Sequence, residues 1–166
     1  MAINWNGKRG LDGLHRRIAA LGHVIRVVDG IEECLDDAAV QAIIDGYTLA
    51  DAKADRRREV SALARTKYDA VTAGISAAEM AGWPILLSEA LTYRAGSTTH
   101  PALDAEAAIR GIPVEALVQK VEGNAAQFQA ARAAIAGTDG KKRDEIDALT
   151  SFEAVAAYDV AGGWPL

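Results

Sequence analysis

Residues 113–137, PVEALVQKVEGNAAQFQAARAAIAG, decide the fold class. Apolar side chains recur there every three or four residues, at Val114, Leu117, Val121, Ala125, Phe128 and Ile135. That spacing places them on one face of an α-helix. Proline suits the first turn of a helix and glycine suits its end, so we predict a helix that begins at Pro113 and closes at Gly137. Residues 141–149 are expected to form another short helix or a continuation of this one.

Capping signals predict further helices on both sides of this stretch. The capping box at residues 76–79 opens a helix that is expected to reach Ala95. We expect a kink or short break in it at Trp83-Pro84, because proline lacks a backbone donor and disfavours helix at the preceding residue. A short helix is predicted from Pro101 to Arg110, with Gly111 ending it.

The end of the chain carries one more such signal. Residues 150–153, TSFE, form a capping box that opens a short helix expected to reach Tyr158. Gly162-Gly163 then release the tail.

The first part of the chain is predicted to hold short elements. Residues 1–10 are expected to form an extended arm or turn, and residues 11–21 a short amphipathic helix. Another short helix is predicted over residues 36–46. A long one follows from Thr48 to about Thr72, with an inner face that includes Val60, Leu63, Ala64, Lys67 or Tyr68, and Val71.

A β-hairpin is predicted between these short helices. Asp29-Gly30 separates two apolar runs, residues 23–28 and 31–35. An Asp-Gly pair in that position is a strong hairpin signal. Because an isolated hairpin is marginally stable in water, it must pack on a helix or on another subunit.

Length and composition favour a mainly α protein with a small N-terminal β-hairpin and a basic arm. The chain has 166 residues, of which 50% are apolar and 5% aromatic. That is enough apolar material for a core built of closely packed helices. We predict an N-terminal segment, residues 1–47, and a helical domain, residues 48–166. No apolar run approaches the roughly 20 residues that span a bilayer, so we expect no contact with a membrane.

Charge is distributed unevenly along the chain. The net charge is −5, whereas residues 1–30 hold five basic and two acidic side chains, or +3, which leaves −8 for the rest. An acidic protein is a poor general binder of nucleic acid. We expect a basic N-terminal arm that docks on an acidic partner; the alternative is an ordinary solvated terminus. The residues predicted to bind a partner are Trp5, Lys8, Arg9, Arg16, Arg17 and Trp164.

Three further features have a functional and a structural interpretation. Arg56-Arg57-Arg58 could bind phosphate, but acidic residues three or four positions away are expected to pair with these arginines. Trp83 lies on an apolar stripe and is expected in the core. Trp164 either folds back on its own domain or anchors a partner.

The sequence contains no recognisable reactive site. It has a single cysteine, Cys34, and three scattered histidines, so neither a disulfide nor a zinc site is expected, and we predict no metal and no cofactor. Acidic pairs are expected at helix starts, where their negative charge interacts favourably with the helix dipole. We therefore expect a protein that is not an enzyme.

Several segments in order resemble one family of proteins. They are residues 37–45 (DAAVQAIID), 75–84 (ISAAEMAGWP), 105–112 (AEAAIRGI), 137–146 (GTDGKKRDEI) and 158–165 (YDVAGGWP). This series resembles small bacteriophage proteins encoded among tail genes and often grouped with tail-fibre assembly proteins, and it covers roughly residues 24–165. The first 22 residues depart from the family pattern.

The resemblance implies a role in the phage tail without enzymatic activity, and it supplies no catalytic residues. We expect a tail or baseplate accessory protein, made in the host cytoplasm and retained in the virion tail, that binds fibre or baseplate proteins in several copies or as a homo-oligomer. One alternative is a tail-fibre assembly chaperone that is absent from the virion. A remote alternative is a small cell-wall hydrolase. We further expect that removal of residues 1–22 leaves the helices folded.

Overall fold

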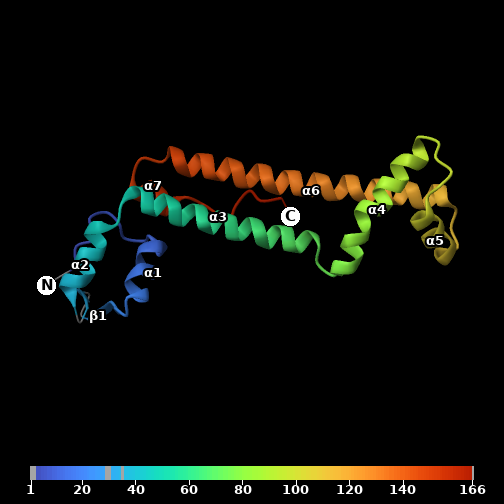
Figure 1. Ribbon diagram of the computed structural model, residues 1–166. Coiled ribbons are helices and arrows are strands. Elements are labelled where there is room, and N and C mark those ends of the chain that lie inside the picture. The colour runs from blue at the N-terminus through green and yellow to red at the C-terminus, as the bar shows by residue number, and fades with distance from the viewer. Residues whose placement is uncertain (1–2, 29–30, 35, 166) are drawn as a thin grey trace. The chain divides into compact units, whose positions relative to one another are not determined.

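The protein is mainly α-helical, as predicted. The computed structural model describes residues 3–28, 31–34 and 36–165, and these form seven helices and one two-stranded sheet (Figure 1). The chain divides into two compact units. The first unit comprises residues 1–65 and 137–164, and the second comprises residues 66–136 and 165–166. The predicted N-terminal segment, residues 1–47, falls within the first unit.

The first unit begins with the short elements that the sequence predicts. Helix α1 spans Asp12–Ala20, and Gly22 follows it in the left-handed conformation at φ +82°. Helix α2 spans Asp37–Gly46, and the Asp36 carboxylate accepts a bond from the backbone N–H of Ala39. Each helix therefore has a local signal at one end, which explains why short segments form helices at all.

The predicted hairpin is present but shorter than expected. Strand β1, Arg26–Val28, pairs antiparallel with β2, Ile31–Glu33, with Arg26 opposite Glu33 and Val27 opposite Glu32. The Asp29-Gly30 turn lies outside the described residues.

Two long helices contribute to this unit. Helix α3, Leu49–Val71, begins with a capping box in which Thr48 Oγ1 accepts from the Asp51 N–H, and Asp51 Oδ2 accepts from the Thr48 N–H. Helix α6, Val114–Ala148, ends beside it: Lys53 Nζ donates to the Asp147 carbonyl at 2.8 Å, and Arg143 donates to Ser61 Oγ at 2.9 Å. The pairing of an early residue of α3 with a late residue of α6 shows that these two segments are antiparallel.

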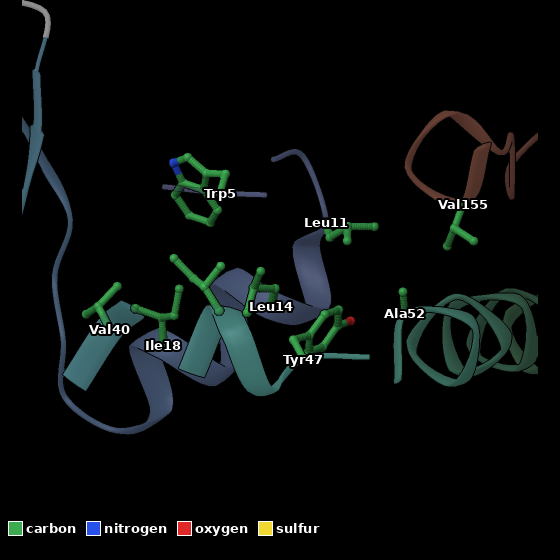
Figure 2. Close-up of a cluster of buried hydrophobic side chains, with 9 residues drawn as sticks. Trp5, Leu11, Leu14, Ile18, Val40, Tyr47, Ala52 and Val155 are labelled. Carbon is green, nitrogen blue, oxygen red and sulfur yellow. The ribbon is translucent and has the colours of Figure 1, made fainter. Parts of the chain in front are cut away.

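The core of the first unit draws on residues far apart in the chain. Figure 2 shows side chains from the residues before α1 and from α1, α2, α3 and α7 (Phe152–Ala157) directed toward one another. The buried members are Trp5, Leu11, Leu14, Ile18, Val40, Ile44, Tyr47, Ala52 and Val155. Burial of these side chains supplies the main stabilisation of short helices that would be marginal alone.

Of the two forms predicted for the N-terminal residues, an extended arm or a turn, the structure has the turn. Residues 3–10 form turns, with positive φ at Asn6, Gly7 and Gly10, and Trp5 is only 8% exposed. The turns bring the indole into the core, where its Nε1–H donates to the Glu32 carboxylate and its ring lies 4.8 Å from that of His15. Trp5, Leu11, Leu14 and Ile18 therefore place this segment in the core, and removal of residues 1–22 would expose the core.

The second unit is built from α4 (Ala77–Arg94), α5 (Pro101–Arg110) and the first part of α6. Its buried residues are Ala90, Leu103, Ala107, Leu117 and Val118. The first turn of α5 has no local side-chain cap. Instead Glu89 of α4 accepts from the backbone N–H groups of Ala102 and Leu103, at 3.2 and 2.9 Å, which joins α4 to α5.

Two predicted helix boundaries were wrong. Helix α4 continues without a break through Pro84, where the missing N–H removes a single bond from a helix that packs on both α5 and α6. Helix α6 continues through Gly137 and Gly140 to Ala148, so the continuation predicted as an alternative is correct. Ile146 and Lys142 are buried beyond these glycines, and this packing offsets the roughly 1 kcal/mol that each glycine costs in a helix.

A smaller correction concerns the last helix. Ser151, rather than Thr150, is the N-cap of α7, and its hydroxyl accepts from the Ala154 N–H at 3.1 Å.

Candidate functional site

A large concave surface lies within the second unit. It is a groove with a cavity of about 800 Å³, walled by α4, the C-terminal half of α5 and the first half of α6. This volume lies within the range of ligand-binding and side-chain-binding pockets. The groove is lined by Ala78, Glu79, Met80, Gly82, Trp83, Pro84, Leu86, Leu87, Glu106, Arg110, Leu117, Lys120, Val121, Asn124, Ala125, Phe128 and Gln129.

Aromatic side chains hold one part of the groove wall in place. The rings of Trp83 and Phe128 meet edge to face, with centroids 5.3 Å apart and an interplanar angle of 76°. The guanidinium of Arg132 lies 5.5 Å from the centroid of the Phe128 ring. Edge-to-face and cation–π contacts both favour a defined ring orientation, so these rings offer a fixed apolar surface.

An ion-pair cluster fixes α4 to α6 beside the groove. Arg94 of α4 pairs with Glu115 at 2.6 Å and with Glu122 at 3.0 Å, both on α6. The hydrogen bonds that Arg94 donates to Glu122, and then the one that it donates to Glu115, raise the pKa of Arg94 above its ordinary value. Arg94 therefore stays charged and sets the position of one wall relative to the other.

Four charged side chains line the groove, together with the amides of Asn124 and Gln129. Glu106 and Arg110, one turn apart on α5, pair at 2.5 Å, and both line the groove. Glu79 and Lys120 are exposed lining residues on α4 and α6. The lining contains no serine, cysteine or histidine, the residue types that most often act as nucleophile or base. An apolar floor with charged walls is suited to binding apolar side chains.

Exposed apolar side chains also occur on the first unit. Leu21, Val24, Val27 and Ile31 are 51–68% exposed, and they lie on or just before the hairpin. Because Val27 pairs with Glu32, Val27 and Ile31 lie on opposite faces of the hairpin. Among the described residues the sheet has two strands, so backbone groups on its edges are available for pairing with a strand of another protein.

Two of the residues predicted to bind a partner are buried. Trp5 lies in the core of the first unit, and Lys8 is 7% exposed. Lys8 Nζ donates to the carbonyl groups of Ile44 and Asp45, at 2.5 and 3.3 Å, and lies 5.2 Å from the centroid of the Phe152 ring. Lys8 therefore caps the C-terminal end of α2, where a positive charge complements the helix dipole.

The predicted basic surface pairs with acidic residues of the same chain. Its members Arg9, Arg16 and Arg17 pair with Glu32 at 2.5 Å, with Glu59 at 2.9 Å and with Asp51 at 2.6 Å, respectively. All three arginines remain substantially exposed, so their outer faces still meet solvent. Their charge is nevertheless largely balanced within the first unit.

The segment after α7 contacts α6 through Tyr158 and Asp159. The hydroxyl of Tyr158 donates to Glu145 at 2.6 Å, and burial together with this bond raises the pKa of Tyr158 to about 12. Lys142 Nζ donates to the Asp159 carbonyl at 2.9 Å. The half-buried Trp164 donates its indole N–H to the Val160 carbonyl, four residues earlier, at 2.8 Å.

The three consecutive arginines form structural pairs. Arg56 pairs with Glu59 and also donates to the Val155 and Ala156 carbonyl groups at the end of α7. Arg57 pairs with Asp147 of α6, which sequence spacing could not predict, and Arg58 pairs with Asp55. The expected pairing within the helix is thus confirmed for Arg56 and Arg58.

The described residues contain no cluster of three or more histidine, cysteine or acidic side chains that could hold a metal ion. Within residues 3–28, 31–34 and 36–165, no helix has the length and apolar character needed to cross a membrane. Comparison with known proteins gave no match to a family model, to a curated protein or to a solved structure.

Sequence reasoning missed the groove. The periodicity did identify Met80, Trp83 and Leu87 as one apolar stripe and Leu117, Val121 and Phe128 as another. Of these residues, Trp83 was expected in the core. The distance between the two helix faces depends on tertiary packing, and no local pattern encodes it.

Proposed function

We propose that this chain is a non-enzymatic accessory protein of a bacteriophage tail or baseplate, which binds other tail proteins and acts in several copies. The observation that carries this proposal is the apolar groove of the second unit. Its aromatic and aliphatic lining suits the capture of protein side chains, and charged and amide side chains supply its polar groups. The tail context is supported by the five sequence segments, in the same order along the chain, that resemble proteins encoded among tail genes.

The hairpin and the groove suit two separate attachments. The hairpin of the first unit offers strand edges to a structural partner, whereas the groove of the second unit offers a concave apolar site. A tail accessory protein needs to hold more than one neighbour in a symmetric assembly. In this proposal each unit carries its own binding surface.

The same groove also supports a second candidate, a tail-fibre assembly chaperone. An open apolar groove can shield an apolar segment of an unassembled fibre protein. The two candidates differ in where the chain is found after assembly: a structural component stays in the particle, whereas a chaperone is released.

The test is to change the groove and follow the chain during phage assembly. Leu87→Asp places a charge on the groove wall at a half-exposed position, and Ala130→Asp adds the same charge to an exposed position of α6 outside the lining. We expect Leu87→Asp to reduce the amount of the chain in particles, or in complexes with tail proteins, by about tenfold or more. Ala130→Asp should behave as wild type. Equal amounts of the two variants would contradict a binding role for the groove.

A further inference from the structure

We propose that the groove of the second unit receives α5 of a second copy of this chain, so that two copies associate about a two-fold axis. The inference rests on the proposed function in one respect, namely that the groove binds protein. It adds the identity of the occupant.

The first observation is an unusually exposed apolar side chain beside the groove. Ile109 of α5 is 87% exposed, the largest value among the exposed large apolar side chains of the described residues. It lies one turn after Glu106 and directly before Arg110, both of which line the groove. Ile109 therefore stands at the edge of an apolar groove that its own position on α5 prevents it from filling.

The second observation is that this face of α5 allows close approach of another helix. Ala102 and Ala105 precede Ile109 by seven and four residues, so they share its side of the helix. Their small side chains let a second helix come near, and Ile109 supplies the projecting apolar group. A cavity of about 800 Å³ has ample room for one such side chain.

The third observation is a self-complementary arrangement of charge. Glu106 and Arg110 lie at equal distances on either side of position 108. When two copies of α5 pair antiparallel about a two-fold axis near that position, Glu106 of each copy faces Arg110 of the other. A two-fold interface requires this kind of pattern, because the same surface must be complementary to itself.

The size of α5 limits the strength of the association. Ten residues of helix are about 15 Å long, and a stable interface normally buries about 800 Å² on each partner. One short helix and one groove cover less than that. We therefore expect a weak dimer, with a dissociation constant on the order of 10 µM.

Sedimentation equilibrium of the full chain at concentrations from about 1 to about 200 µM tests the proposal. We expect wild type to shift from monomer to dimer, and Ile109→Glu to stay monomeric with unchanged circular dichroism. The matched control is Leu91→Glu, which changes an exposed apolar residue of the second unit outside the groove lining and should dimerise as wild type does. A wild-type chain that is monomeric throughout, or an Ile109→Glu variant that dimerises normally, would overturn the proposal.

A charge exchange tests the antiparallel geometry directly. Glu106→Arg alone places two like charges opposite each other, and so does Arg110→Glu alone, so each variant should dimerise at least about tenfold more weakly than wild type. When the two variants are mixed, every facing pair is again of opposite sign, and a heterodimer should form. In the mixture each variant still lacks the Glu106–Arg110 ion pair within its own α5. Recovery of dimerisation can therefore come only from contacts between the two copies. A mixture that stays monomeric would refute the antiparallel pairing.

Failure of this inference can be distinguished from failure of the proposed function. If the purified chain is monomeric while Leu87→Asp still abolishes association with tail proteins, the groove binds another protein and the second-copy inference fails. If the chain dimerises as described but is absent from particles and from complexes with tail proteins, the tail function fails.

Discussion

Replacement of Gly13 by alanine should destabilise the first unit, although alanine is the better helix former. Gly13 lies in α1 against Asp55 of α3. A Cβ added at Gly13 would lie 2.6 Å from the Asp55 Cβ and closer still to its carboxylate. Contacts this short do not occur between non-bonded carbon atoms, so the carboxylate or the helix must move.

The magnitude follows from what Asp55 does in the fold. Asp55 is 4% exposed, accepts a bond from the Tyr47 hydroxyl at 2.5 Å and pairs with Arg58. Loss of a buried hydrogen bond to a charged group costs about 2–3 kcal/mol, and overpacking costs about 1–3 kcal/mol more. Against this, alanine gains about 1 kcal/mol over glycine in a helix. The net loss in the free energy of unfolding should be about 2–5 kcal/mol.

Urea unfolding followed by tryptophan fluorescence measures this loss. A Trp83→Phe background confines the signal to the first unit, which holds Trp5 and Trp164. Gly46→Ala is the matched control, because Gly46 is exposed at the end of α2 and an added Cβ would meet no atom within 4 Å. If Gly13→Ala were as stable as Gly46→Ala, the reasoning would be refuted.

A double variant separates the clash from helix propensity. In an Asp55→Gly background both the carboxylate and the Cβ that obstruct position 13 are absent, so Gly13→Ala should become neutral or stabilising by up to about 1 kcal/mol. An unchanged loss of about 2–5 kcal/mol there would show that the cost of alanine at Gly13 does not come from the Asp55 side chain.

Three further predictions concern single positions. Glu89→Ala should speed hydrogen exchange of the first-turn amides of α5 and cost about 1–2 kcal/mol, since Glu89 caps that turn; unchanged exchange would contradict the capping role. The hydrogen bonds from Thr48, and then that from Arg17, lower the pKa of Asp51 from 3.8 to about 2, so its stabilisation is complete above about pH 5 and is lost as pH falls toward 2. Asp51→Asn should therefore cost about 1 kcal/mol at pH 6 and little at pH 2, measured by urea unfolding at both values, and a cost independent of pH would contradict the assignment. Pro84→Ala should restore a helix bond within α4 and raise the stability of the second unit by about 1–2 kcal/mol in thermal unfolding, whereas a loss would show that the ring is needed for packing.

Local sequence signals predicted most of the helix boundaries. Asp36, Thr48, Ser76 and Pro101 each precede or begin a helix as expected, because capping and proline preferences depend only on neighbouring residues. At Pro84 and Gly137 the same local preferences predicted a break and a helix end, but both helices continue there. The cost of a proline or glycine inside a helix can be offset by tertiary packing, which the local sequence does not contain.

The role of the N-terminal residues was harder to predict. A basic segment with a single tryptophan has the composition of an arm, but Trp5 enters the core and Lys8 caps α2. The acids that balance Arg16 and Arg17 lie more than thirty residues away in the chain. Such long-range pairs have no signature in sequence spacing.

Quantitative mass spectrometry of phage particles, and of tail-protein complexes from lysed infected cells, tests the tail assignment most directly. Tail organelles are symmetric, so we expect a fixed number of copies per particle, near a multiple of three or six. Presence only in the complexes of the lysate would select the assembly chaperone. Absence from both the particles and the complexes would contradict the account.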